Sequence, residues 1–118
     1  MADQRGHVLE VEPCDKRVRV SFNGEVIADT TDAKVLRETG LPPVYYVPFA
    51  DIRREVLTRT DHSTHCPFKG QASYWTVTVG DRAAENALWA YEDPIPESRY
   101  LVDHAAFYTN KVELEIDP

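Results

Sequence analysis

The densest group of side chains that could do chemistry lies at residues 61–70, which read DHSTHCPFKG. The thiol of Cys66 could act as a nucleophile if a neighbouring cation, either His65 or Lys69, activated it. A free cysteine is more often a small buried hydrophobic residue, so catalysis at Cys66 with His65 is a candidate role and not the expected one. The run 61–63, Asp-His-Ser, is not a catalytic triad because sequence neighbours point apart. It predicts a turn.

Two groups of residues could bind a metal ion. His62, His65, Cys66 and His104 could supply four zinc ligands, but no CxxC pair is present and the spacing is not that of a known zinc finger. Carboxylates at positions 113, 115 and 117 alternate near the end of the chain and could hold Mg²⁺. Alternation with apolar residues instead favours a solvated strand face, as in the first strand. We expect no metal and no cofactor.

Several well-defined catalytic and phosphate-binding motifs are absent. The five glycines, at positions 6, 24, 40, 70 and 80, are too widely spaced for a GxGxxG fingerprint, a P-loop or a GxSxG elbow. No HExxH motif is present either, which excludes the common zinc-protease arrangement.

A ligand pocket is the preferred prediction. Lys69 precedes a strand that carries Tyr74 and Trp75, and a following strand ends with Trp89 and Tyr91. An ammonium group among aromatic side chains suits an anionic or aromatic small molecule. The structural alternatives are a lysine in solvent and aromatic residues that only fill the core.

The first elements that must position these residues are β-strands. Apolar and polar residues alternate over 8–12 and 17–22, and an antiparallel hairpin closed by residues 13–16 would set Glu12 opposite Arg17 and Glu10 opposite Arg19. Asn-Gly at positions 23 and 24 predicts a tight turn into a strand over 25–28. The sequence therefore predicts a three-stranded meander at the start of the chain.

The middle of the chain contains more varied signals. Residues 30–40 fit a short capped helix or a strand, and we favour a strand or turn. The β-rich residues 44–47 are bounded by prolines and predict a short strand at a sheet edge or between turns. Apolar spacing of three and four over 49–57 predicts one short helix.

The remainder of the chain is predicted to form two hairpins. Residues 74–79 alternate as a strand, Gly80-Asp81 turns the chain, and the segment to Tyr91 returns, followed by a proline-containing loop over 92–97. Residues 105–108 and 112–116 flank a turn at 109–111 and predict a further hairpin. The expected fold is mainly β, one small domain over 1–118 built from packed antiparallel sheets or a partly open barrel.

Composition narrows the class of protein. The formal net charge is −7 in 118 residues, so the basic surface of a nonspecific nucleic-acid or membrane binder is not expected. No apolar run is long enough to cross a bilayer, and residues 1–12 do not resemble a signal peptide. Cys14 and Cys66 are expected to be free thiols in a cytoplasmic protein.

Five sequence blocks resemble a known family. They read FNGEVIADT, PPVYYVPFADI, HCPFKGQASYWTV, WAYEDP and AAFY, in this order, and the resemblance extends over about 18–116. The chain resembles the bacterial domain of unknown function 427 family. The resemblance implies a small β-tent or Mss4-like fold of antiparallel sheets, without the zinc-binding CxxC pairs of related tents.

The resemblance leaves the activity open. The family is also filed as nucleotidyltransferase-like, which would require a Gly-Ser turn that this sequence lacks and acidic metal ligands, for which only Glu113 and Glu115 are suitable. The motif residues carried over have no assigned role: Asp51, Cys66, Pro67, Lys69, Gly70, Tyr74, Trp75, Trp89, Tyr91 and Pro94.

Three functions follow as hypotheses. The first is a module that binds an anionic or aromatic small molecule at Lys69, Tyr74, Trp75, Trp89 and Tyr91. The second is an enzyme, either thiol-dependent through Cys66 or Mg²⁺-dependent and nucleotidyltransferase-like. The third is a self-association module, in which an exposed strand edge pairs with a second copy as a homodimer.

Overall fold

A computed structural model describes residues 9–117, and these residues form antiparallel strands joined by turns and single helical turns. The strands are β1 (Leu9–Pro13), β2 (Val18–Phe22), β3 (Glu25–Thr30), β4 (Lys34–Glu38), β5 (Val44–Pro48), β6 (Leu57–Cys66), β7 (Gly70–Val79), β8 (Arg82–Ala90), β9 (His104–Phe107) and β10 (Glu113–Ile116). The helical turns are all 3₁₀: η1 (Phe49–Asp51), η2 (Arg54–Val56) and η3 (Pro96–Leu101). The mainly β prediction is confirmed.

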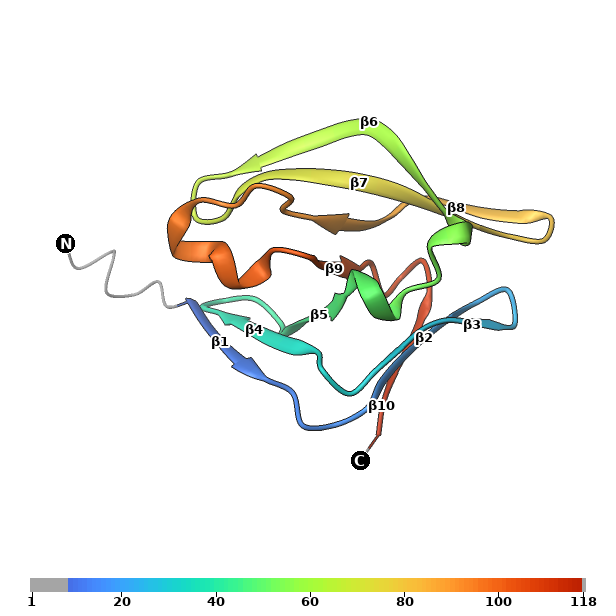
Figure 1. The fold of residues 1–118 in the computed structure, drawn as a ribbon, viewed down its shortest axis with the longest axis horizontal. Coiled ribbons are helices and arrows are strands. Elements are labelled where there is room, and N and C mark those ends of the chain that lie inside the picture. The colour runs from blue at the N-terminus through green and yellow to red at the C-terminus, as the bar shows by residue number, and fades with distance from the viewer. Residues whose placement is uncertain (1–8, 118) are drawn as a thin grey trace.

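The strands form two sheets. The larger has the order β1-β4-β5-β9-β8-β7-β6 and the smaller has the order β10-β2-β3. Figure 1 shows the larger sheet running from β6 at the top through β9 to β1, with the small sheet at the lower right. β1 and β6 are the two edge strands of the larger sheet, so this sheet is not a closed barrel. The finer β-tent assignment stays a prediction.

The predicted opening meander is wrong in its first pairing. β1 pairs with β4 in the larger sheet, so that Glu10 faces Arg37, whereas β2 pairs with β3 and β10 in the smaller sheet. The expected partners Glu12 and Arg17 are separated: Arg37 lies 3.4 Å from Glu12, and Arg17 forms an ion pair with Asp29. Opposite charges also meet in the observed pairings. The charge pattern alone therefore does not identify which strand is the partner.

The Asn-Gly turn is confirmed. Asn23 has φ of 51° and Gly24 has φ of 82°, the left-handed conformations that a tight turn between twisted strands requires. The turn joins β2 to β3. The Asn23 side chain also donates a hydrogen bond to the carbonyl oxygen of Val79 at 2.9 Å, which links the small sheet to the β7–β8 hairpin.

The predictions for the middle of the chain are partly confirmed. The favoured strand within 30–40 is β4, and the strand at 44–47 is β5, but β5 lies between β4 and β9 and is not an edge. The helix expected over 49–57 is instead two separate 3₁₀ turns. Ile52, between them, is buried and bridges Ala28 of β3, which explains the apolar spacing without a continuous helix.

The last predicted hairpin is also wrong in its pairing. A turn does form, because the amides of Lys111 and Val112 both donate to the carbonyl oxygen of Tyr108. The strands on its two sides then diverge: β9 pairs with β5 and β8, and β10 pairs with β2. The predicted faces of β10 are confirmed, since Val112 is buried and residues 113, 115 and 117 are exposed. The β7–β8 hairpin is confirmed as predicted.

Two apolar clusters cover opposite faces of the larger sheet. The main core fills the space between the two sheets and includes Val20, Ile27, Trp75, Val77 and Leu88. The second cluster lies on the other face of the larger sheet, where η3 covers it; its buried members are Leu36, Tyr46, Ala72, Tyr74, Tyr91, Leu101 and Ala106. This second cluster is unusual in its tyrosine content.

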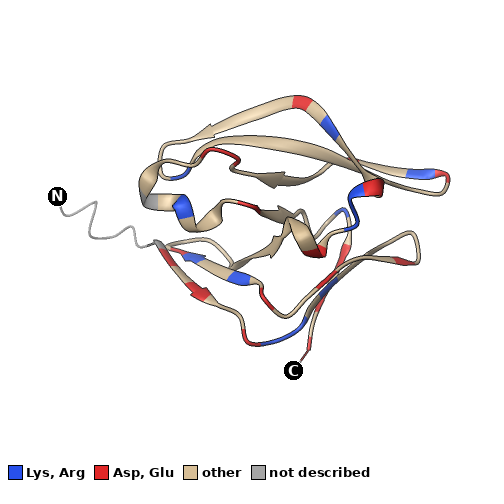
Figure 2. Cartoon of the chain, in the orientation of Figure 1, with Lys and Arg blue, Asp and Glu red and all other residues tan. Residues whose placement is uncertain are grey.

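Charged residues are distributed over most elements. Figure 2 shows acidic and basic positions interspersed along the strands and turns. Among residues 9–117, no helix has the length and apolar character needed to cross a membrane.

Candidate functional site

The turn from β6 to β7 holds the most reactive residues in a fixed conformation. The Lys69 amide donates to the carbonyl oxygen of Cys66 at 3.1 Å, and the Lys69 carbonyl accepts from the Ile95 amide at 3.0 Å. The Ser98 hydroxyl donates to the Phe68 carbonyl at 2.7 Å. Ile95, just before η3, and Ser98, within η3, thus fix the turn from outside.

Gly70 explains why the sequence can make this close contact. Its φ is 117°, and a β-carbon here would lie 3.3 Å from both the Ile95 nitrogen and the Pro94 Cα. A side chain would be strained by the backbone conformation and by this contact. Glycine therefore allows the turn to pack directly against the 94–95 backbone.

Lys69 is buried and already has charged and aromatic partners. Its side chain is 9 % exposed, and its Nζ lies 3.2 Å from Oε1 of Glu38, whose side chain is 11 % exposed. The same Nζ lies 3.7 Å from the Cys66 sulfur and 5.9 Å from the centre of the Tyr91 ring. The predicted cation is therefore present in the site, but its charge is balanced by Glu38.

A group of aromatic residues surrounds this ion pair on the same face of the larger sheet. The Tyr46 and Trp89 rings meet edge to face with centres 6.4 Å apart, and Trp89 packs on Tyr108 at 4.5 Å. Tyr74 accepts or donates a hydrogen bond with the Thr64 hydroxyl at 2.9 Å. We name Cys66, Lys69, Glu38 and these aromatic residues, with Tyr91, the tyrosine cluster.

Burial controls the ionisation of the tyrosine cluster. It raises the pKa of Tyr46 and of Tyr91 well above the ordinary phenol value, with a smaller contribution from neighbouring negative charge. Burial, with a hydrogen bond to Tyr74, raises the pKa of Tyr108 to about 12. These phenols stay neutral at physiological pH and can donate or accept hydrogen bonds without bearing charge.

Trp75 lies on the other face of the sheet and lines a pocket. The pocket has a volume of about 250 Å³ and is lined by Phe49, Arg54, Trp75, Ala90, Tyr91, Glu92 and Asp103. The Phe49 and Trp75 rings meet edge to face with centres 5.3 Å apart. The guanidinium of Arg54 lies 4.9 Å from the centre of the Phe49 ring. We name this the Trp75 pocket.

The predicted ligand residues are therefore divided between two places. Tyr74, Trp89 and Lys69 belong to the tyrosine cluster, Trp75 belongs to the Trp75 pocket, and Tyr91 contributes to both. Alternation along β7 explains the division, because the side chains of residues 74 and 75 must point to opposite faces of the sheet. Whether these residues bind a ligand stays a prediction.

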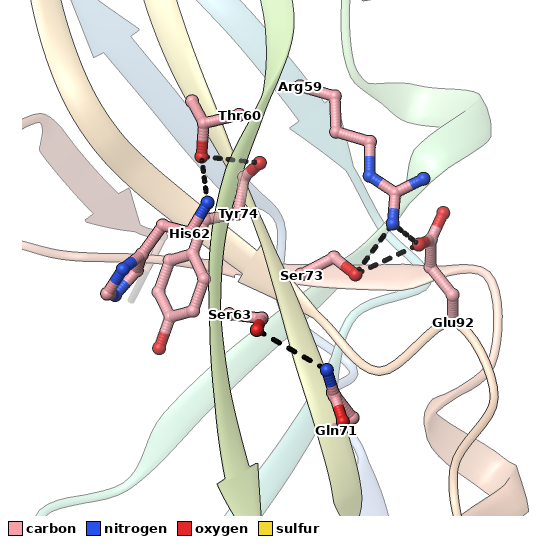
Figure 3. Close-up of polar contacts among 8 residues, drawn as sticks. All are labelled: Arg59, Thr60, His62, Ser63, Gln71, Ser73, Tyr74 and Glu92. Atoms are coloured by element: carbon pink, nitrogen blue, oxygen red, sulfur yellow. Dashed lines mark hydrogen bonds and ion pairs between the residues drawn. The ribbon is translucent and has the colours of Figure 1, made fainter.

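A polar group beside the Trp75 pocket was not anticipated from the sequence. Arg59 lies 2.7 Å from Glu92 and donates to the Ser73 hydroxyl at 3.0 Å, and its guanidinium stands 5.8 Å from the centre of the Trp75 ring. Figure 3 shows Arg59 directed toward Ser73 and Glu92, while His62 lies beside Tyr74 on another side of β6. Arg59 and Ser73 lie on the paired strands β6 and β7, and Glu92 follows β8, which pairs with β7; these pairings could not be inferred from local spacing.

Arg54 and Phe49 were also missed as site residues. They lie on η1 and η2, the segment predicted as a short helix. An exposed arginine five positions after an aromatic residue is a common surface arrangement, so the sequence offered no signal. Only the fold brings them beside Trp75.

The other candidate residues are distributed along the strands. The run 61–63 belongs to β6 and not to a turn, and the turn instead occupies the residues after Cys66. His65 and Cys66 are consecutive on this strand, so their side chains point to opposite faces and Lys69 is the cation next to the thiol. His104 begins β9. Both Cys14 and Cys66 are free thiols, as predicted.

The described part of the chain contains no group of three or more His, Cys, Asp or Glu side chains placed to hold a metal ion. Glu113, Glu115 and Asp117 are exposed on or next to β10, in the small sheet. The tyrosine cluster lies on the far face of the larger sheet from the main core.

Comparison with known proteins supports the resemblance drawn from the motifs. A family model labelled NTP_transf_9 and described as a domain of unknown function (DUF427) matches residues 10–118. No curated protein matches the chain significantly. The family match spans both sheets, the tyrosine cluster and the Trp75 pocket. This chain belongs to the DUF427 family of domains of unknown function.

Proposed function

We propose that this protein binds a small aromatic anion in the Trp75 pocket. The observation that carries the proposal is the position of Arg54, whose guanidinium lies over the Phe49 ring at the pocket and forms no ion pair with any side chain that the structure describes. A guanidinium without a carboxylate partner can take a carboxylate or phosphate group of a ligand. The adjacent Phe49 and Trp75 provide apolar contact for a ring.

The other charged residues that line the pocket are compatible with an anionic ligand at Arg54. Glu92 is neutralised by Arg59, so it does not oppose an incoming anion. Asp103 also lines the pocket and can accept a hydrogen bond from a hydroxyl or amino group of the ligand. Because the whole chain carries a formal charge of −7, attraction of an anion must come from the local arginine and not from the overall field.

Pocket size restricts the ligand further. Pockets for drug-sized molecules have volumes of about 300–1,000 Å³. The volume of about 250 Å³ therefore suits a compact ligand with a single ring system. In this proposal Lys69, Tyr74 and Trp89 support the site from the opposite face of the sheet through Tyr91, and Arg54 replaces Lys69 as the cation in contact with the ligand.

The test is a thermal-shift screen of the purified protein with aromatic carboxylates, aromatic phosphates and nucleotides, the last with and without Mg²⁺. A ligand of the native state must raise the melting temperature. We expect a compact aromatic carboxylate or phosphate to raise it for the wild type and for Arg82→Ala, but not for Arg54→Ala. Arg82 is the matched control because its guanidinium also covers a phenylalanine, Phe22, at 5.4 Å, in another part of the molecule.

Two outcomes would contradict the proposal. One is an equal shift in Arg54→Ala and the wild type, which would place the ligand elsewhere. The other is a shift that requires both a nucleotide and Mg²⁺, which would favour the nucleotidyltransferase-like enzyme. The two free thiols also support a reducing compartment, and we propose the cytoplasm as the location.

A homodimer is a second proposal, supported by the edge strand β6. This strand has ten residues and pairs on one side only, with β7. Such an edge presents unpaired backbone groups to a second copy. Light scattering after size exclusion should give twice the mass of the monomer at high concentration, and a monomer at every concentration would contradict this proposal.

A further inference from the structure

We propose that Cys66 and Lys69 form a direct sulfur–nitrogen bond when the protein meets a hydroperoxide, so that the β6–β7 turn is a site of reversible oxidation. This inference concerns a different face of the sheet from the Trp75 pocket and does not depend on ligand binding there. It rests on a thiol, a buried amine and a carboxylate that the fold holds together.

The geometry brings the two reacting atoms close together. The Lys69 nitrogen lies 3.7 Å from the Cys66 sulfur, in a turn fixed by the hydrogen bond from the Lys69 amide to the Cys66 carbonyl. The hydrogen bond from Ile95 and the packing at Gly70 hold the other end of the turn. The lysine therefore lacks the freedom of a surface side chain, and its nitrogen stays near the sulfur.

Exposure favours oxidation at Cys66 over the second thiol. Cys66 is half-buried, so a small peroxide can reach it, whereas Cys14 is buried in the main core. The Lys69 side chain is 91 % buried, so water competes poorly for the oxidised sulfur on that side. Susceptibility of a thiol to oxidation follows its exposure and its charged surroundings.

The chemistry balances with one equivalent of peroxide. The Cys66 sulfur attacks one oxygen of the hydroperoxide and the O–O bond breaks. The products are a sulfenic acid and the alcohol of the hydroperoxide, which takes the thiol proton and is water when the oxidant is hydrogen peroxide. The sulfur is oxidised by two electrons and the peroxide is reduced. The Lys69 ammonium passes a proton to a neighbouring carboxylate, for which Glu38 at 3.2 Å is placed, and the free amine attacks the sulfur. The S–N bond forms as the S–O bond breaks, and the second product is water.

The bond would change the charge of the turn. A sulfenamide nitrogen carries no positive charge, so oxidation would remove the cation that faces Glu38 and the Tyr91 ring. Thiol reductants would cleave the bond and restore both groups. Oxidation of the turn would thus change the charge next to Glu38, which ends β4, and next to Tyr91, which follows β8.

The test uses the Cys14→Ser variant, in which an intramolecular disulfide cannot form. After treatment with one equivalent of hydrogen peroxide, we expect the intact protein to become lighter by two hydrogen atoms and to return to its starting mass with dithiothreitol. Because trypsin requires a free lysine, the peptides 60–69 and 70–82 should be replaced by one peptide spanning both. Reduction should restore the cleavage.

Lys69→Arg in the same background is the matched variant, because it keeps the positive charge but lacks a nucleophilic amine. It should instead gain one oxygen atom and react with a 1,3-dione that traps sulfenic acids. The proposal is overturned if the lysine-containing protein only gains oxygen atoms and is still cleaved after Lys69. Since that result is read on the Cys14→Ser protein alone, it holds even if Lys69→Arg does not fold.

Discussion

Asn23 lies in the turn between β2 and β3 of the small sheet, and its side chain donates a 2.9 Å hydrogen bond to the main-chain oxygen of Val79 in the larger sheet. Asn23 also occupies a left-handed backbone conformation in its turn. The backbone of Asn23 therefore forms the hairpin turn, and its side chain joins the small sheet to the larger one.

We expect Asn23→Asp to lower the free energy of unfolding by about 1–2 kcal/mol, because a carboxylate cannot donate to the Val79 oxygen. Asn23→Gly removes the same bond but relieves the backbone conformation, so its loss should be smaller. Urea denaturation of both variants measures the two effects separately. Equal stability of Asn23→Asp and the wild type would show that the bond makes no net contribution.

Gly70 and Gly40 form a second matched pair. Both have positive φ, but a β-carbon at Gly40 meets nothing within 4 Å, whereas one at Gly70 meets the 94–95 backbone at 3.3 Å. Gly40→Ala should cost about 1 kcal/mol from backbone conformation alone, and Gly70→Ala about 2–3 kcal/mol. Thermal denaturation ranks the two variants by stability. The prediction is wrong if Gly40→Ala is destabilised more than Gly70→Ala.

Removing one partner of the buried pair Lys69 and Glu38 should lower the free energy of unfolding strongly. Lys69→Met removes the ammonium that lies 3.2 Å from the buried carboxylate of Glu38 and should lower the free energy of unfolding by about 3 kcal/mol. Arg37→Met, on the same strand as Glu38, removes the partner of the exposed Glu12 and should change little. Comparable losses in the two variants, measured by chemical denaturation, would contradict the burial argument.

Alkaline pH should unfold the protein through the tyrosine cluster. Folding raises the pKa of Tyr46, Tyr91 and Tyr108 above the unfolded value of 10.0, so the neutral phenols stabilise the fold below pH 10. That stability is lost as pH rises from 10 toward the folded pKa values, which is about 12 for Tyr108. Each of the two buried phenols, Tyr46 and Tyr91, adds a slope of about 1.4 kcal/mol per pH unit above pH 10, and the more exposed Tyr108 adds less because solvent screens it.

Tyr46→Phe tests this slope. The free energy of unfolding, measured between pH 9 and 11.5 by urea denaturation, should match the wild-type slope below pH 10 and fall less steeply above pH 10, by about 1.4 kcal/mol per pH unit. Val44→Ala removes apolar contact in the same cluster without removing a phenol, so it should shift the whole profile and keep its slope. An unchanged slope in Tyr46→Phe would refute the assignment to this residue.

The sequence predicted local features well and distant pairings badly. Alternation at 74–79 and the Asn-Gly turn depend on residues near one another, and the structure confirms both. Glu12 and Arg17 failed as a pair because charge matching does not select among several strands. Strand partners are chosen by burial across the two sheets, which a local pattern does not contain.

The same limit applies to the candidate site. Lys69, Tyr74 and Trp75 were identified because they are close in the sequence, but alternation on β7 sends the last two to opposite faces. Arg54 reaches the Trp75 pocket only through the fold. Glu38 could not be linked to Lys69 in advance, because Glu38 ends β4 and Lys69 follows β6, and these strands are not neighbours in the larger sheet.

The position of β10 beside β2 has a consequence for how the chain folds. Val18 pairs with Ile116, near the opposite end of the described chain. β1 likewise cannot pair until β4, which comes after β2 and β3 in the sequence, has formed. Closing such long loops before any pairing energy is gained slows folding to about the millisecond-to-second range. Until β10 arrives, one edge of β2 remains open, and during synthesis this edge is where a second nascent chain could attach.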